Sequence, residues 1–236
     1  MLQAFVIGLG TARFKLLEPK LAEIGISATF WKATRADNPE MGTYLSHAGV
    51  WKHILKSKTP SFVFEDDVAV RIDAKEFNRT YAATQTLDAV MYGYCLAPRR
   101  KPERIDAAVY KYAESSCTHA YWLTPRAARA LLEYAQSYRG KMVSDAITRR
   151  GLKLVRTGMV SPPFFFQDIW RYNSALRNEN VARRNVALFY EDTPWEWIIA
   201  TATATFALGG LAVYTRNGDG RRKRIAKAAQ AGLQTP

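Results

Sequence analysis

Cysteine and histidine are scarce in this chain of 236 residues, which contains two cysteines, Cys95 and Cys117, and three histidines, His47, His53 and His119. The cysteines lack the close spacing of a metal-binding motif, so a structural zinc site is not predicted. We expect two reduced, half-buried thiols instead.

Acidic residues are also few, because 21 Asp and Glu stand against 34 Lys and Arg, which gives a formal charge of +13. Such a charge indicates an anionic partner, whether a nucleic acid, a phospholipid surface or a phosphorylated substrate. The aromatic residues are evenly spread and form no stacking platform, so a nucleic acid is not the expected partner.

A secretory signal is absent from the start, MLQAFVIGLG, which has no basic segment before its apolar run and is typical of a first strand. We therefore expect the folded domain in the cytoplasm. What the chain does have is a hydrophobic fraction of 48%, which is ample for a sizeable core.

Apolar runs of strand length alternate with amphipathic segments of helical period. Strands are expected at 4–9, 26–33, 61–64, 88–94, 107–113 and 117–124, and helices at 43–57 and 125–138, with a polar helix ending near residue 86. A further helix is expected only after Glu18, because Pro19 would interrupt an earlier start and suits a first turn. The alternation predicts an α/β layered fold with a mostly parallel sheet and ligands at the carboxyl ends of strands.

One of these strand ends carries an acidic cluster, since SFVFEDDVAV places Glu65, Asp66 and Asp67 directly after an apolar run. Two charges about 4 Å apart repel by roughly 4 kcal/mol at an effective dielectric of about 20, so the cluster needs a cation or water. Alternate residues of an extended segment share a side, which predicts that Glu65 and Asp67 bind one Mn²⁺ or Mg²⁺ ion while Asp66 points elsewhere. An acidic surface turn is the alternative.

Four stretches together resemble glycosyltransferase family 25, which includes bacterial lipooligosaccharide galactosyltransferases and the collagen galactosyltransferases. They are AFVIGLGTARFKLLEPKLAEIGISATFWKAT, GTYLSHAGVWKHI, FEDDVAV, and THAYWLTPRAARALLE before an isolated Asp145. The resemblance spans about residues 4 to 170. It implies a GT-A-like, nucleotide-sugar-binding fold and transfer from a nucleotide sugar, usually a UDP-sugar, with inversion at the anomeric carbon.

The resemblance also implies roles for single residues. The family's acidic metal motif falls on Glu65, Asp66 and Asp67, its Leu-Ser-His element includes Ser46 and His47, and an early arginine and a late acid fall on Arg13 and Asp145. We expect the metal on Glu65 and Asp67, the donor on Arg13, Ser46, His47 and Asp66, and the catalytic base at Asp145. The chain departs from the family where a single Arg13 replaces paired arginines, and where His119 stands in place of a small residue.

Each of these roles has a plainer alternative. Asp145 follows apolar residues whose burial would raise its pKa to a value useful for a base, but it could instead cap a helix or pair with Arg149. A lone helical histidine such as His47 is more often a hydrogen-bonded structural residue. Ser46 could cap a turn, and Arg13 could be a solvated arginine.

Near the C-terminus the stretch WIIATATATFALGGLAVY, at 197–214, contains no charge and precedes a basic tail with Arg221, Arg222, Lys223 and Arg224. At about 1.5 Å per residue a helix there would be roughly 27 Å long, against a hydrocarbon core of about 30 Å. We therefore divide the chain into a glycosyltransferase domain at 1–194 and a C-terminal part at 195–236. Its hydrophobic helix is expected to span a membrane or lie in its interface, with a soluble packing helix as the alternative.

Together these features predict a metal-dependent, inverting glycosyltransferase. It would transfer galactose from UDP-galactose to an anionic saccharide or lipid-linked acceptor of cell-envelope lipopolysaccharide or lipooligosaccharide. Metal-dependent phosphoryl transfer would need a second set of metal ligands, for which we find no sequence signal. The remaining alternative is a non-catalytic basic protein that keeps the fold and binds a membrane or a nucleic acid.

Overall fold

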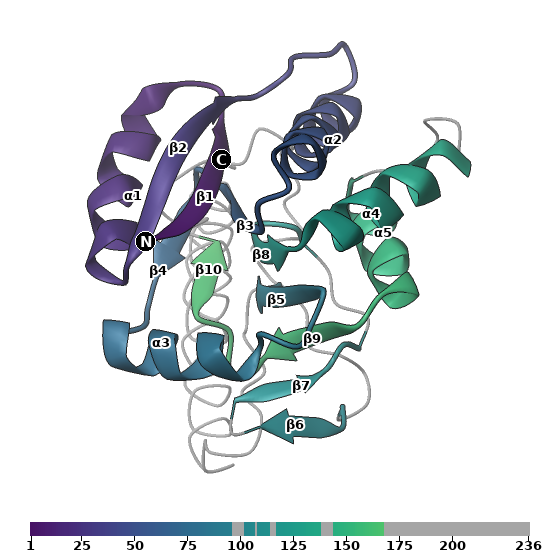
Figure 1. Ribbon diagram of the computed structural model, residues 1–236. Helices are drawn as coiled ribbons and strands as arrows, with labels where there is room; N and C mark the ends of the chain where they lie inside the picture. The colour runs from purple at the N-terminus through teal and green to yellow at the C-terminus, as the bar shows by residue number, and fades with distance from the viewer. Residues whose placement is uncertain (96–101, 107, 114–116, 138–143, 168–236) are drawn as a thin grey trace, which may run out of the picture. The chain divides into compact units, whose positions relative to one another are not determined.

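The computed structural model describes residues 1–95, 102–106, 108–113, 117–137 and 144–167, all within the compact unit Met1–Leu188 (Figure 1). The predicted hydrophobic helix at 197–214, the basic tail and the predicted domain boundary at 194 lie outside these residues. Across the ranges just given, none of the helices has the length and apolar character needed to cross a membrane.

Within the described ranges, eight strands form one sheet in the order β2-β1-β3-β8-β5-β9-β7-β6. They are β1 Leu2–Gly8, β2 Ile26–Lys32, β3 Ser61–Glu65, β5 Ala89–Gly93, β6 Arg104–Asp106, β7 Val109–Lys111, β8 Ala120–Leu123 and β9 Thr157–Val160. The pairs β1–β2, β1–β3 and β5–β9 are parallel, and the other four pairs are antiparallel. Six described strands thus share one direction while β7 and β8 oppose it, so the predicted α/β fold is confirmed with a mixed sheet.

The described part of the chain also contains five α-helices: α1 Thr11–Glu23, α2 Pro39–Ser57, α3 Ala74–Ala83, α4 Pro125–Ser137 and α5 Ser144–Gly151, the last leading into a short 3₁₀ turn at Leu152–Leu154. The start of α2 is fixed by Asn38, whose side chain accepts a hydrogen bond from the backbone of Glu40 at 2.8 Å. Asp73 caps α3 in the same way through the backbone of Glu76, also at 2.8 Å.

The helices cover both faces of the sheet, because the strand side chains alternate between two apolar clusters (Figure 1). In β1, Phe5 and Ile7 pack with residues of α2, α4 and α5, whereas Ala4 and Val6 pack with residues of α1 and α3. The result is three layers, with the sheet in the middle.

Helix α1 corrects one expectation, because it begins at Thr11 rather than after Glu18 and keeps Pro19 in its interior. Leu17 and Leu21 are both buried against the sheet, one on each side of the proline. Burial of these two side chains holds the helix together although proline cannot donate its hydrogen bond.

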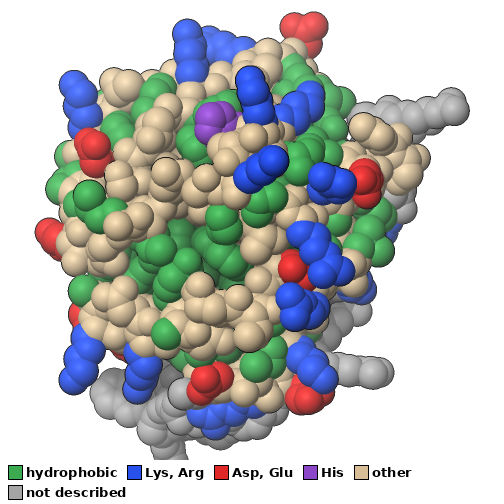
Figure 2. Space-filling model, in the orientation of Figure 1, with side chains coloured by type: hydrophobic (Ala, Val, Ile, Leu, Met, Phe, Trp, Pro, Cys, Tyr) green, Lys and Arg blue, Asp and Glu red, His purple; other side chains and the backbone are tan. Residues whose placement is uncertain are grey.

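The face shown in Figure 2 has hydrophobic side chains in its hollowed centre, while Lys and Arg gather mainly along the side formed by α4 and α5. The exposed basic residues of α4, α5 and the segment after α5 are Arg126, Arg129, Arg150, Lys153 and Arg156. Part of the positive charge is therefore concentrated on one side of the molecule.

Candidate functional site

The candidate site lies at the end of the central sheet where three parallel strands have their carboxyl termini. These are β1, β3 and β5, which end at Gly8, Glu65 and Gly93. Strand β8 begins at the same end, because it runs antiparallel to β3 and β5 and places Ala120 opposite Phe64. Residues that follow β3 therefore meet residues that precede β8, and the Glu65 backbone N–H donates to the His119 carbonyl at 2.9 Å.

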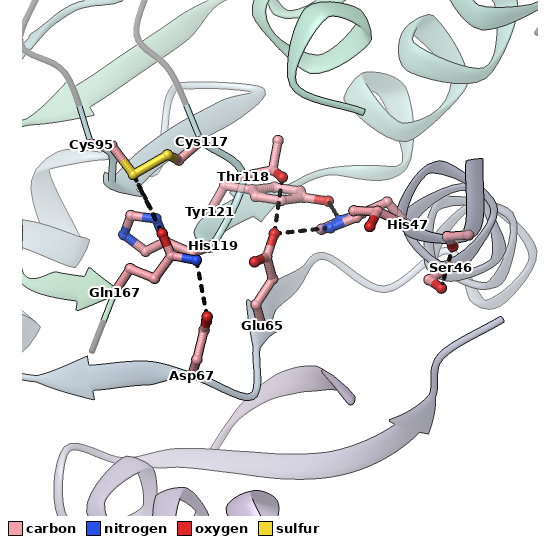
Figure 3. Close-up of polar contacts among 12 residues, drawn as sticks. Ser46, His47, Glu65, Asp67, Cys95, Cys117, Thr118, His119, Tyr121 and Gln167 are labelled. Atoms are coloured by element: carbon pink, nitrogen blue, oxygen red, sulfur yellow. Dashed lines mark hydrogen bonds and ion pairs between the residues drawn. A yellow bond between two sulfur atoms is a disulfide. The ribbon is translucent and has the colours of Figure 1, made fainter. Parts of the chain in front are cut away.

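Glu65 faces helix α2 and the segment before β8 (Figure 3). Its Oε1 atom accepts a hydrogen bond from Thr118 Oγ1 at 3.1 Å and lies 3.4 Å from His47 Nε2. Burial alone would raise the pKa of Glu65, but the contact and charge of His47, the charge of His119 and the Thr118 hydrogen bond outweigh it. The net result is a lowered pKa, so this carboxyl is ionised at neutral pH.

His47 is fully buried, and its partners fix its ring. Its Nδ1 lies 2.7 Å from the Tyr121 hydroxyl, which accepts a hydrogen bond from Trp51 Nε1 at 2.9 Å. A carboxylate can only accept, so the proton of a neutral His47 belongs on Nε2, facing Glu65, and Nδ1 accepts from Tyr121. The 3.4 Å between His47 Nε2 and Glu65 Oε1 is long for a hydrogen bond, so Nε2 has no hydrogen-bond partner among the described residues.

Asp67 is held from a different direction. A second, two-stranded sheet pairs β4 (Val68–Val70) with β10 (Phe165–Gln167) and places Gln167 opposite Val68. Gln167 Nε2 donates to Asp67 Oδ2 at 2.9 Å (Figure 3). Burial, with the negative charges of Glu65 and Asp66, raises the pKa of Asp67 to about 7, although Gln167 and Arg13 act in the opposite direction.

Asp66 points away from its two neighbours, as predicted. Its Oδ1 lies 3.3 Å from Arg13 Nη1, in the first turn of α1, and its backbone N–H donates to the Ile7 carbonyl at 2.9 Å. A Cβ atom at Gly8 would lie 2.6 Å from Asp66 Oδ2, so a side chain at this end of β1 would displace the Asp66 carboxylate. Burial raises the pKa of Asp66, and the nearby Arg13 charge offsets part of that rise.

Glu65 and Asp67 each keep one carboxylate oxygen without a hydrogen bond among the described residues. Each carboxylate uses one oxygen for protein contacts, and in the part of the chain that the structure describes Glu65 Oε2 makes no hydrogen bond. Asp67 Oδ1 is buried and likewise has no hydrogen-bond partner there. A buried, unsatisfied carboxylate oxygen is costly, and a hard cation such as Mn²⁺ or Mg²⁺ would satisfy it.

Two other predicted residues lie apart from the acids. Ser46 is buried in α2, where its hydroxyl donates to the Gly42 carbonyl at 2.7 Å and accepts from the Thr34 backbone at 2.8 Å. These bonds tie α2 to the segment after β2. Asp145 is the second residue of α5, but its side chain is outside what the structure describes.

Sequence reasoning missed Thr118, Tyr121 and Gln167 as members of the site. Thr118 and Tyr121 belong to the stretch THAYWLT, but their contacts with Glu65 and His47 depend on how β8 pairs with β3. Gln167 contacts Asp67 only because β10 pairs with β4. No local motif signals either arrangement.

The two cysteines also differ from expectation, because Cys95 and Cys117 form a disulfide rather than two reduced thiols. Cys95 follows β5 and Cys117 precedes β8, and these strands are neighbours, with Gly93 opposite Ala120. The pairing brings the two Cα atoms to 5.6 Å although the residues are 22 positions apart.

Comparison with known proteins gives one family match, over residues 27–148, to "Glycosyltransferase family 25 (LPS biosynthesis protein)". This match covers more than half of the chain. No curated protein matches.

Among solved structures, apo UDP-glucose pyrophosphorylase has a TM-score of 0.44 at 10% identity, over 68% of this chain and 90% of that chain. UDP-glucose pyrophosphorylase complexed with UDP-glucose has a TM-score of 0.44 at 11% identity over the same shares. A putative glucose-1-phosphate thymidylyltransferase from Bacillus anthracis, in complex with sucrose, has a TM-score of 0.42 at 10% identity, over 82% of this chain and 98% of that chain. Likenesses of this strength carry no functional inference.

Proposed function

Because this chain belongs to glycosyltransferase family 25, and is thus a glycosyltransferase, we propose that it transfers galactose from UDP-galactose with inversion at the anomeric carbon. The proposed acceptor is an anionic saccharide or lipid-linked saccharide of lipopolysaccharide or lipooligosaccharide. Membership in an enzyme family weighs against the alternative of a non-catalytic basic protein.

The observation that carries the proposal is a pair of carboxylate oxygens at the end of β3, Glu65 Oε2 and Asp67 Oδ1, which have no hydrogen-bond partner among the described residues. We propose that they hold Mn²⁺ or Mg²⁺. When bound, the ion would neutralise negative charge on the departing diphosphate. Asp66, turned toward Arg13, would stay out of the metal shell and face the donor side.

We propose that Arg13 assists binding of the donor. It stands at the start of α1, directly after β1, and its side chain is about one third exposed while it contacts Asp66. A guanidinium in this position can donate to a phosphate oxygen while it keeps one contact with a carboxylate. His47, held by Tyr121, would keep Glu65 ionised and oriented, and Ser46 would anchor the helix that carries His47.

Asp145 is our proposed base, which would accept the proton of the attacking acceptor hydroxyl. Helix α5 supports this assignment in one respect, because Ile147 is buried in the same apolar cluster as Trp51 and Tyr121. The helix therefore covers the face of the sheet that also holds His47. The exposed basic residues along α4 and α5 would favour an anionic acceptor.

The test is a transfer assay on the full-length chain with UDP-galactose, UDP-glucose and other nucleotide sugars, each with Mn²⁺, Mg²⁺ or EDTA. We expect release of UDP only with a divalent ion, and NMR of the product should show an inverted anomeric centre. Asp67→Asn and Glu65→Gln should each lower kcat/KM at least about 100-fold. Asp73→Asn, which preserves the cap of α3, is the matched control; metal-independent transfer, or an active Asp67→Asn, would refute the proposal.

A further inference from the structure

Cys95, Cys117 and His119 form a second cluster of metal-ligating side chains at the same end of the sheet (Figure 3). In the described ranges this is the one group of three His, Cys, Asp or Glu residues whose ligand atoms all lie within 4.8 Å of one another. Linear spacing hides the cluster, since Cys95 lies 22 positions before Cys117. None of the roles proposed above uses it.

The imidazole of His119 is oriented as a ligand. Its Nε2 lies 3.1 Å from the carbonyl oxygen of Phe165, which can only accept, so Nε2 carries the proton of the neutral ring. The lone pair then belongs to Nδ1, which lies 3.9 Å from Cys95 Sγ. A histidine that binds a metal commonly donates its other N–H to a backbone carbonyl in this way.

The backbone around the cluster is adapted to it. A Cβ atom at Gly93 would lie 2.5 Å from His119 Nε2 and 2.7 Å from the Phe165 oxygen, so only glycine leaves room for that hydrogen bond. Cys117 has a φ of 73°, a left-handed conformation that is uncommon for residues other than glycine and that recurs at functional sites. Cys95 and His119 are buried, while Cys117 is half-buried.

We propose that Cys95, Cys117 and His119 form a redox-controlled site for a soft divalent cation of the zinc class. The disulfide is the oxidised, metal-free state. An external thiol reductant supplies two electrons and two protons, leaves as its own disulfide, and yields two thiols here. Zn²⁺ then binds the two sulfurs and His119 Nδ1 with release of the two thiol protons.

The ligand types separate this site from the acidic one. Two thiolates and an imidazole select zinc-like ions, whereas carboxylate oxygens select Mn²⁺ or Mg²⁺. Gln167 lies between the sites, because its Oε1 is 3.6 Å from Cys95 Sγ and its Nε2 donates to Asp67. The amide oxygen is thus placed to complete the zinc coordination, with a water molecule as the other candidate.

The test uses the full-length chain, reduced with a phosphine or left oxidised, and titrated with Co²⁺ as a spectroscopic probe before displacement by Zn²⁺. The reduced chain should bind one ion with thiolate-to-cobalt absorption, and the oxidised chain should show none. Cys117→Ser and His119→Gln should each weaken binding at least about tenfold. The exposed His53→Gln is the matched control and should bind like the unmodified chain.

Cys117→Ser decides the matter if the buried His119→Gln fails to fold, because circular dichroism can first establish that the serine variant is native. Absence of thiolate-to-cobalt absorption in the reduced chain, or equal binding by the oxidised chain or by Cys117→Ser, would overturn the proposal. These readouts measure binding alone, so they stand apart from the success or failure of the sugar-transfer assay.

Discussion

Asp67 is strongly altered by its surroundings, because burial and two neighbouring carboxyls raise its pKa to about 7. An ordinary aspartate has a pKa of about 3.9. Between these values the folded protein binds a proton that the unfolded chain does not, so stability falls as pH rises through that window. Glu65, whose pKa is lowered, acts in the opposite sense but only below its ordinary value of about 4.3.

Asp67→Asn should therefore stabilise the metal-free protein at pH 8, by about 1–3 kcal/mol, and have little effect at pH 5. The amide removes the buried charge while keeping the shape of the side chain. Urea unfolding in EDTA at the two pH values measures the difference, with Asp73→Asn as the control at an exposed acid. Parallel pH dependence in Asp67→Asn and the unmodified protein would show that Asp67 does not carry the destabilising charge.

Tyr121→Phe should lower the free energy of unfolding by about 1–3 kcal/mol, because Trp51 Nε1 and His47 Nδ1 both lose their hydroxyl partner inside the core. The ¹⁵N shifts of His47 report its tautomer directly, and a chain with three histidines gives a spectrum simple enough to assign. We expect the Nε2–H form in the unmodified protein and a mixture in Tyr121→Phe. Trp51→Phe, which preserves the Tyr121–His47 contact, should keep the Nε2–H form; a single Nδ1–H form in the unmodified protein would contradict the assignment.

Part of the site was predictable residue by residue. The contrast between the acids and the apolar strand SFVF marked Glu65 to Asp67, and period-two alternation placed Asp66 on the other side. Thr118 and Gln167 were not predictable, since their positions depend on the pairing of β8 with β3 and of β10 with β4. The metal and donor roles of the predicted residues stay predictions.

Among the elements, α1 contains an internal proline, which a single substitution can replace with a better helix former. Pro19 is exposed in the middle of the helix and cannot donate to the carbonyl of Lys15. Pro19→Ala should stabilise the protein by about 1–3 kcal/mol, less than the full helix-propensity difference because the unfolded chain gains freedom. Thermal unfolding measures it against Lys20→Ala, an exposed neighbour that should be neutral; an unchanged or lower Tm for Pro19→Ala would contradict this explanation.

Elements with a long periodic pattern were predictable, whereas several of the three-residue strands were not. The helix containing Trp51 and the strand before Glu65 lie where the apolar pattern places them. Strands β4, β6 and β10 have three residues each, too few for alternation to show, and they form because a neighbouring strand offers hydrogen bonds. The preference of proline for the first turn of a helix predicted too late a start for α1. Burial of Leu17 and Leu21 overrides that preference.

At the level of the whole molecule, the direction of β8 decides where the site forms. Alternation of strands and helices predicted an α/β fold, but no local feature indicates that β8 runs opposite to β3 and β5. That reversal brings Thr118 and His119 to the strand ends, where they contact Glu65. Without this reversal of β8, Glu65 would lack its contacts with Thr118 and His119.

The C-terminal stretch at 197–214 leads to a prediction for the full-length chain, which we propose to be cytoplasmic and membrane-associated. It should float with vesicles of anionic phospholipid at low salt. Leu208→Arg should reduce flotation strongly, because an arginine in an apolar span costs about 3 kcal/mol. Leu154→Arg, at an exposed position of the described domain, is the control; a full-length chain that stays with the soluble fraction would refute membrane association.

The most direct test of the central claim is the melting temperature of the full-length protein with UDP-galactose, measured with Mn²⁺ and with EDTA. We predict a rise only when nucleotide sugar and Mn²⁺ are both present, which corresponds to about 2.7 kcal/mol of added stability at a ligand concentration of 100 Kd, and no such rise in Asp67→Asn. Equal stabilisation in EDTA, or none by any nucleotide sugar with any divalent ion, would contradict a metal-bound donor site at Glu65 and Asp67.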